Sequence, residues 1–178
     1  KHYGSGDGRG KRMMDPQTEV TMEENSYMEM EMVQIKGVDS TRRSTKADLA
    51  AGAKLVIRER LLTHGSQFAE SSFVVNLNGE DSSANVISRS VAKEDSTQIF
   101  NAEINGNAKC AGHSECDAII MDNARISAIP RITANNTDAA LIHEAAIGKI
   151  AGEQIIKLMT LGLTEEEAEA QIVNGFLK

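Results

Sequence analysis

The sequence predicts a mainly β protein, built as a β-solenoid, and three observations favour this fold class. Short segments with strand character follow one another up to about residue 140. The breaks between them consist largely of Gly, Asn, Asp and Ser, as in NGEDSSAN and NGNA. Aromatic residues make up only 3% of the chain and Trp is absent. The core must therefore consist of aliphatic and small side chains, which suit thin, repeated layers.

Two other β architectures stay open, because no sharp sequence repeat is visible. A sandwich or a barrel would also use short strands with polar breaks. The solenoid is favoured because small residues and Asn recur along the chain, and Asn side chains can form ladders on successive coils. A doubly wound α/β sheet is disfavoured, because connections this short cannot hold crossover helices.

The first clear strand is predicted within residues 26–37, SYMEMEMVQIKG. Here Met28, Met30 and Met32 alternate with glutamates, which gives a strand with one apolar and one charged face. Methionines can be soft metal ligands, but regular alternation indicates core packing.

Further strands are predicted in the segments that follow, each bounded by polar turn residues. A turn is expected just before the last of these strands, around KCAGHSE. The predicted strand segments are residues 53–62, 72–79, 85–91, 97–106 and 117–122.

Two short helices are predicted at the C-terminal end. EQIIKLMTLG places apolar residues at helical spacing and Gly162 at the position of a C-cap. Thr164 is a natural N-cap for the second helix, and Glu167 completes a capping box. Gly175 is expected to end or loosen its last turn. We place the boundary between the β core, residues 1–142, and the helical segment, residues 143–178.

Composition excludes several classes of partner. The net charge of −7 argues against a nucleic-acid surface, which needs clustered Lys and Arg. No apolar run approaches the ~20 residues of a membrane helix, so no membrane partner is expected. Two cysteines without a secretory leader do not indicate a disulfide framework. We therefore expect a cytoplasmic protein with reduced thiols.

No enzyme or nucleotide fingerprint is present. GxSxG, Walker A and Rossmann patterns are absent. The glycine-rich GSGDGRG is not followed by a helix pattern that would point backbone amides at a phosphate. We expect no nucleotide to bind this chain.

The stretch KCAGHSECDAIIMD holds both cysteines, Cys110 and Cys116, together with His113. A structural zinc site needs four ligands, and no second pair is available. If a strand begins at Cys116 and a turn precedes it, the three groups diverge, so a self-contained metal site is disfavoured. His143 and Glu144 form a second candidate pair, although a lone histidine there is more often structural.

Several motifs together resemble one known family. YGSG is followed by VQIKGVDSTRRSTKADL, ECD, IPRI, HEAAIGKI and EQIIKLMTLGLTEEEAEAQIVNGF. This order, over nearly the whole chain, resembles the C-terminal core of the SufB/SufD family of iron–sulfur cluster assembly proteins. Glu after His in HEA is more similar to SufB than to SufD. The resemblance implies a right-handed parallel β-helix followed by a short helical segment.

The resemblance also implies partners and a cargo. Family members pair through their β-helices, as SufB with SufD or as a homodimer, and receive sulfur from a cysteine desulfurase system. A transient 4Fe–4S or 2Fe–2S cluster forms on the scaffold. The C-terminal helices bind SufC, an ABC-type ATPase. The implied ATPase-docking residues here are Ile155, Ile156, Met159, Leu163, Ile172, Val173 and Phe176.

Three site residues follow from the resemblance. Cys116 corresponds to the cysteine on which SufB builds the cluster, Glu144 to an acidic residue that ligates or positions it, and His143 to a histidine at the shared interface. Thiolate and imidazole suit iron, while a carboxylate is a weaker ligand that favours release. Cys110 and His113 have no counterpart in the family, and Cys110 is the weakest metal candidate.

The expected function is a scaffold for iron–sulfur cluster assembly without catalytic turnover of its own. The alternative is a structural β-solenoid that assembles end to end and binds no cluster. A β-helix acyltransferase is disfavoured, because that class shows a tight hexapeptide repeat that this sequence lacks.

Overall fold

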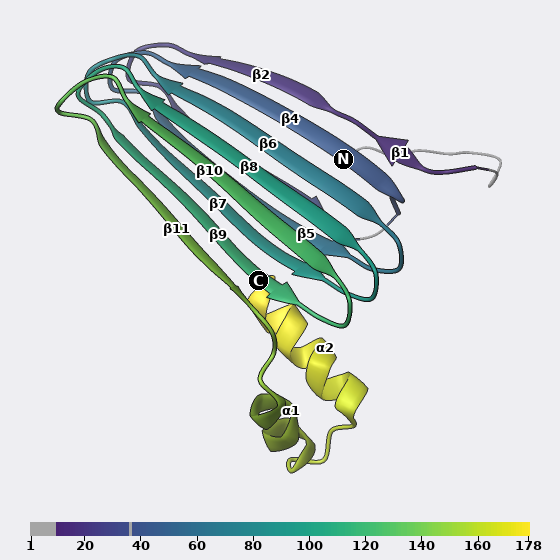
Figure 1. Ribbon diagram of the computed structural model, residues 1–178. Helices are drawn as coiled ribbons and strands as arrows, with labels where there is room; N and C mark the ends of the chain where they lie inside the picture. The colour runs from purple at the N-terminus through teal and green to yellow at the C-terminus, as the bar shows by residue number, and fades with distance from the viewer. Residues whose placement is uncertain (1–9, 36) are drawn as a thin grey trace.

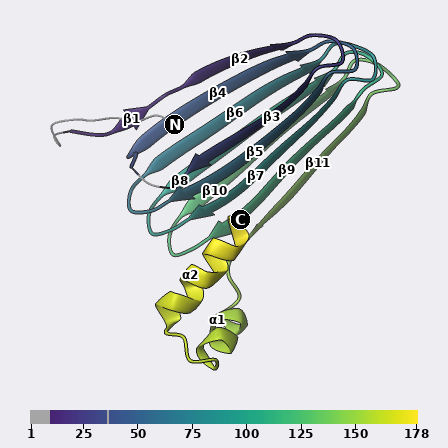
Figure 2. The same cartoon turned by 180° about the vertical axis from the view of Figure 1, so that it is seen from behind.

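Most strands alternate buried and exposed side chains residue by residue, and this pattern makes the chain coil around a thin apolar layer. The computed structural model describes residues 10–35 and 37–178 (Figure 1). The YGSG and most of the GSGDGRG motif lie outside the described residues. Two elongated sheets stack face to face, and the helices extend from one end of the stack (Figures 1 and 2).

Each coil contributes one strand to each sheet, except that the first described coil gives both β1 and β2 to the first sheet. The first sheet contains β1 (Met13–Met14), β2 (Gln17–Met22), β4 (Ser40–Leu49), β6 (Phe68–Leu77), β8 (Thr97–Gly106) and β10 (Arg125–Ala134). The second sheet contains β3 (Tyr27–Gln34), β5 (Lys54–Thr63), β7 (Ser83–Ala92), β9 (Ala111–Ile120) and β11 (Ala140–Gly148). The helices are α1 (Gly152–Met159) and α2 (Glu165–Phe176).

All strand pairs are parallel and keep one register from coil to coil. Ser40 pairs with Phe68, and Phe68 pairs with Thr97. In the second sheet Lys54 pairs with Ser83, and Ser83 with Ala111. The predicted parallel β-helix, a β-solenoid of about five turns, is thereby confirmed.

The core is the layer between the two sheets. Its largest side chains include Phe73 and Phe100, whose ring centroids lie 5.8 Å apart. Val, Leu, Ile and Ala fill most of the remainder, as the low aromatic content required. Met28, Met30 and Met32 pack against this layer, which confirms their prediction as core residues.

Asparagine ladders join successive coils, as the sequence predicted. The Nδ2 of Asn107 donates to Oδ1 of Asn78 at 2.7 Å, and the Nδ2 of Asn135 donates to Oδ1 of Asn107 at 2.7 Å. These side chains occupy equivalent positions at the ends of consecutive strands, so each amide satisfies the next.

The tight stacking also explains a glycine. Gly79 follows β6, and a Cβ built on it would lie 2.0 Å from the backbone nitrogen of Ala51 in the preceding coil. Only a residue without a side chain fits where two turns approach this closely.

The structure adds strands that the sequence did not predict. These are β1, β2, β4, β10 and β11. β4 was missed because its segment, STRRSTKADL, is polar, although its inward positions are all buried. The strand predicted at residues 117–122 is β9, which begins earlier, at Ala111. The turn expected around KCAGHSE therefore lies before Ala111.

The C-terminal helices follow the prediction closely. Thr164 and Glu167 form the reciprocal capping box at the start of α2. Gly162 adopts a positive φ of 97° just after α1. α2 continues through Gly175 to Phe176, so this glycine lies within the last turn. The expected boundary after residue 142 falls inside β11, and His143 and Glu144 are strand residues.

Candidate functional site

β9 presents its chemistry on two opposite faces. Ser114 and Cys116 point into the core and are about 1% exposed, whereas His113, Glu115 and Asp117 lie on the outer face. His113 therefore points away from the two buried cysteines, and the three groups of the KCAGHSEC stretch do not meet, as expected. The predicted reason was a turn before Cys116, but the cause is strand alternation.

Cys116 is a shielded, protonated thiol. Burial raises its pKa to about 12, and the nearby carboxylates of Glu59 and Asp117 add to the effect. In the sheet it pairs with Ser88 on one side and Ala145 on the other. A thiol in this state is a poor nucleophile at neutral pH, so its chemistry requires a change in its surroundings.

His143 lies on the same interior face as Cys116. It pairs with Ser114 across β9 and β11, while Ala145 pairs with Cys116. The imidazole therefore lies on the strand next to that of Cys116, opposite the residue two positions before the thiol. Burial lowers the pKa of His143, the neighbouring His113 lowers it further, and Glu144 acts in the opposite direction. A neutral imidazole is the form that can ligate iron.

Glu144 lies on the other side of the sheet. Its carboxylate Oε2 is 3.5 Å from Nε2 of His113, and its side chain is 66% exposed. The Nδ1 of His113 lies 3.1 Å from Oδ1 of Asn85. Glu144 also pairs in register with Glu115, whose pKa is raised by burial and by a hydrogen bond to Asp117. The structure thus brings Cys116 and His143 together and separates Glu144 from them by the thickness of the sheet.

Cys110 is buried, but it does not share a site with Cys116. It lies just before β9, where burial raises the pKa of its thiol. Six strand positions separate the two cysteines, about 20 Å along an extended chain. Both cysteines are free. Within residues 10–35 and 37–178, no group of three or more His, Cys, Asp or Glu side chains could hold a metal ion.

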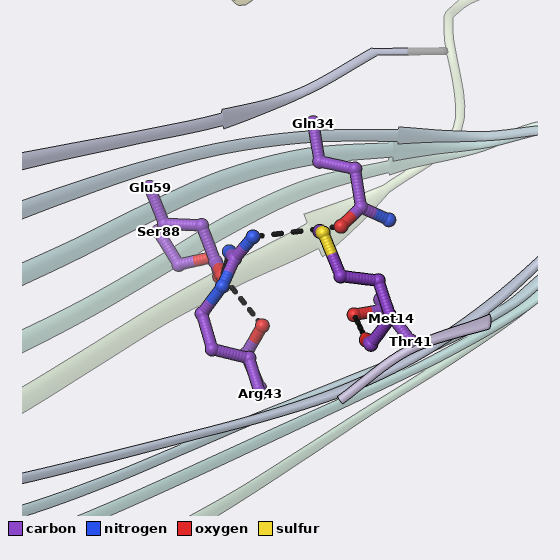
Figure 3. Close-up of polar contacts among 7 residues, drawn as sticks. Met14, Gln34, Thr41, Arg43, Glu59 and Ser88 are labelled. Atoms are coloured by element: carbon purple, nitrogen blue, oxygen red, sulfur yellow. Dashed lines mark hydrogen bonds and ion pairs between the residues drawn. The ribbon is translucent and has the colours of Figure 1, made fainter. Parts of the chain in front are cut away.

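A buried polar cluster that the sequence did not predict surrounds Glu59, which lies in the same interior row as Cys116 (Figure 3). The Nη1 of Arg43 is 2.9 Å from Oε1 of Glu59, and the hydroxyl of Ser88 donates to Oε2 at 2.9 Å. Ser71 also donates to Glu59, and Gln34 accepts from Arg43. The sequence signal that could have revealed it is a charged residue at an inward position. Glu59 lies on the same inward face of β5 as Ile57 and Leu61, two residues from each.

This cluster leads along the solenoid axis to Cys116. Glu59 pairs with Ser88, and Ser88 pairs with Cys116. Arg43 balances the negative charge of Glu59, and the hydroxyls of Ser71 and Ser88 donate hydrogen bonds to its carboxylate oxygens. Three successive coils therefore place polar or sulfur-containing side chains in one interior row.

The last coil leaves apolar surface uncovered. Among the described strands, β10 pairs only with β8 and β11 only with β9. Ile132 and Ile147 stand at inward positions by register, yet they are 41% and 40% exposed. His143 lies on this last coil, in the edge strand β11, and Cys116 lies on the neighbouring strand β9.

The helices carry a second apolar surface. Ile156 is 62% exposed and Met159 is 42% exposed on α1, whereas Val173 is buried. Ile155, Leu163, Ile172 and Phe176 are half-buried. Lys93, in the turn after β7, forms an ion pair with Glu169 and joins α2 to the solenoid. In the described part of the chain, no helix is long and apolar enough to cross a bilayer.

The chain is similar to known proteins over almost its full length. The model of the SufBD core domain, SUF system FeS cluster assembly, matches residues 10–176. An iron–sulfur cluster assembly SufBD family protein of Archaeoglobus fulgidus is 32% identical over 165 residues, which are 92% of this chain and 44% of the relative.

Two further relatives bear the same description. One from Pyrococcus horikoshii is 29% identical over 172 residues, 96% of this chain and 52% of the relative. One from Methanothermobacter thermautotrophicus is 43% identical over 106 residues, 58% of this chain and 26% of the relative. The chain thus spans between a quarter and about half of the length of these relatives. Since the family model matches nearly every described residue, the chain belongs to the SufBD family of iron–sulfur cluster assembly proteins of the SUF system.

Proposed function

We propose that this chain is a scaffold on which an iron–sulfur cluster, 4Fe–4S or 2Fe–2S, is assembled transiently, without catalytic turnover of its own. The single observation that carries the proposal is the placement of Cys116 and His143 on one interior face, on the last two strands of the second sheet. A thiolate and a neutral imidazole are ligands that iron accepts. The proposal places the protein in the cytoplasm, with sulfur supplied by a cysteine desulfurase system.

The burial of Cys116 in this structure explains why a partner is needed. Cys116 is protonated and shielded, so iron and sulfide reach it only when the edge coil moves. Glu144 joins the ligand set in this proposal only if β11 rotates or separates, because it now faces outward beside His113. An open site with few ligands suits a cargo that must leave again.

The open coil end supports a second subunit, either a copy of this chain or a SufB/SufD paralogue. The outer edges of β10 and β11 carry backbone groups without strand partners in the described chain, and Ile132 and Ile147 are exposed beside them. A partner there would bury apolar surface and add ligands next to Cys116 and His143.

The helix pair supports docking of a SufC-like ABC-type ATPase. α1 has no fully buried residue, and its apolar side chains Ile156 and Met159 remain exposed. ATP-driven movement of α1 and α2 would pull on β11, since only three residues separate β11 from α1. Such a pull would favour the open state by population shift.

The test is anaerobic reconstitution with ferrous iron and sulfide. Wild type is expected to develop charge-transfer absorption, and Cys116→Ala is expected to lose most of it. Cys110→Ala is the matched control, because it removes the other buried thiol, which lies outside the site. Equal absorption in Cys116→Ala and wild type would overturn the site assignment.

The open coil end also favours the alternative function, a structural solenoid that assembles end to end. That function predicts polymers in size-exclusion chromatography and no chromophore after reconstitution. Reconstitution therefore distinguishes the two candidates directly.

A further inference from the structure

Two buried polar atoms beside Cys116 have no hydrogen-bond partner within the described residues. They are the hydroxyl oxygen of Ser114 and the Nδ1 of His143. Ser114 is 1% exposed. Buried polar atoms are normally hydrogen-bonded, so an unpaired one requires an explanation.

The two atoms belong to paired residues. Ser114 and His143 are register partners on adjacent parallel strands, about 4.8 Å apart between strands. Both lie at inward positions, and Ser114 is also two residues from Cys116 on the same strand. The serine is therefore next to both members of the interior pair.

Packing alone does not explain a serine here. In the preceding coils the same row holds Ile57 on β5 and Val86 on β7, both buried. The row changes from apolar to polar only at Ser114, and His143 is the next residue in it. A hydroxyl enters the apolar row at the one position that adjoins an imidazole.

We propose that Ser114 is a positioning residue for His143: its hydroxyl oxygen accepts a hydrogen bond from Nδ1–H and thereby leaves the Nε2 lone pair free. A histidine that ligates a metal through one nitrogen usually donates its other N–H to an oxygen acceptor. Ser114 and His143 are register partners on neighbouring strands, which places the two side chains next to each other on the interior face. The inference rests on the proposed function only in assigning iron as the metal that Nε2 binds.

The first measurement is the tautomer of His143 in the cluster-free protein. Long-range proton–nitrogen NMR on histidine-labelled protein reports which ring nitrogen carries the proton, at a pH where the ring is neutral. His143→Asn identifies the signals. Wild type is expected to show the Nδ1–H form.

The variants are Ser114→Thr and Ser114→Val, which have nearly equal volume and differ in the hydroxyl. Val86 in the same row shows that a valine side chain can be accommodated in this layer. Thr is expected to keep the Nδ1–H form, and Val is expected to shift the tautomer equilibrium. Thermal unfolding of both variants checks that they fold equally well. If both fold poorly, Ser114→Ala against wild type gives the same comparison.

The second measurement separates this inference from the proposed function. Iron affinity under anaerobic conditions is expected to fall about tenfold or more in the Val variant and to be retained in the Thr variant. An unchanged tautomer in the Val variant, or an Nε2–H form in wild type, overturns the inference while cluster binding by wild type upholds the function. A hydroxyl-dependent tautomer with no cluster binding upholds the positioning role and overturns the proposed function.

Discussion

At the scale of single residues, the interior of this solenoid holds charged, polar and thiol side chains beside its aliphatic ones. Glu59, Arg43, Ser88 and Cys116 are buried between the two sheets, and the half-buried His143 faces the same interior. Arg43, Glu59 and Ser88 are joined by hydrogen bonds across facing and adjoining strands. Two predictions concern these interior residues.

The first prediction is that Cys116 makes stability fall at alkaline pH. Its folded pKa, about 12, exceeds the usual 9.0, so the folded state retains a proton that the unfolded state loses. The stabilisation is complete below pH 9 and is lost as pH rises from 9 toward 12. Between pH 7 and pH 10 wild type should lose about 1 kcal/mol more than Cys116→Ser. Urea unfolding at both pH values measures this; equal losses would contradict it.

The second prediction concerns the buried ion pair. Arg43→Met leaves Glu59 charged without its cation, and the free energy of unfolding should fall by about 3–5 kcal/mol. Arg12→Met is the matched control, because its ion pair with Asp39 is exposed and screened by solvent, so its loss should change stability far less. The double variant with Glu59→Met should recover much of the loss. Chemical denaturation measures all four proteins, and similar losses for Arg43→Met and Arg12→Met would refute the assignment.

At the scale of elements, strands and helices differ in how completely they are covered. The strands from β4 to β9 are packed on both sides by neighbouring coils, whereas α1 has no fully buried residue. An amphipathic helix that leaves its apolar face open is typical of a docking surface.

The third prediction tests this surface. Ile156→Glu should abolish co-purification of an ABC-type ATPase, because it places a charge in the exposed apolar face of α1. Gln154→Glu adds the same charge at an exposed, polar position two residues away and should leave co-purification intact. Binding by both variants would remove α1 from the interface. The measurement is a pull-down with the ATPase of the same SUF system.

At the scale of the whole molecule, the solenoid is a column whose last coil is open. Its interior layer continues to the edge at Ile132 and Ile147, which no element within residues 10–35 and 37–178 covers. Solenoids generally need a cap or a partner at such an end.

The fourth prediction follows from this open end. Ile132→Lys should convert a dimer to a monomer at micromolar concentration, because a charge would enter the apolar surface of the interface. Ser127→Lys adds the same charge on the outer face of β10 and should leave the dimer unchanged. Light scattering after size-exclusion chromatography measures the mass. A monomeric wild type, or a dimeric Ile132→Lys variant, would contradict a self-associating coil end.

Local pattern determined much of this protein. Alternation predicted the strand around Met30, and polar breaks bounded the predicted strand around Phe100. The Asn positions predicted the ladders, and the Thr164–Glu167 spacing predicted the capping box. These features depend on residues close together in the sequence or on a simple period, so a single chain of letters reveals them.

Only the tertiary structure decided which groups meet. Register between β9 and β11 places His143 beside Ser114 and near Cys116, and it turns Glu144 outward to His113. The register of β5, β7 and β9 likewise aligns Glu59, Ser88 and Cys116 along the solenoid axis. A shift of one residue would reverse every one of these faces, and no local pattern records the pairing of strands that lie 27 to 29 residues apart. The chemistry of the site is therefore a property of coil stacking, which the sequence specifies only through the packing of the whole core.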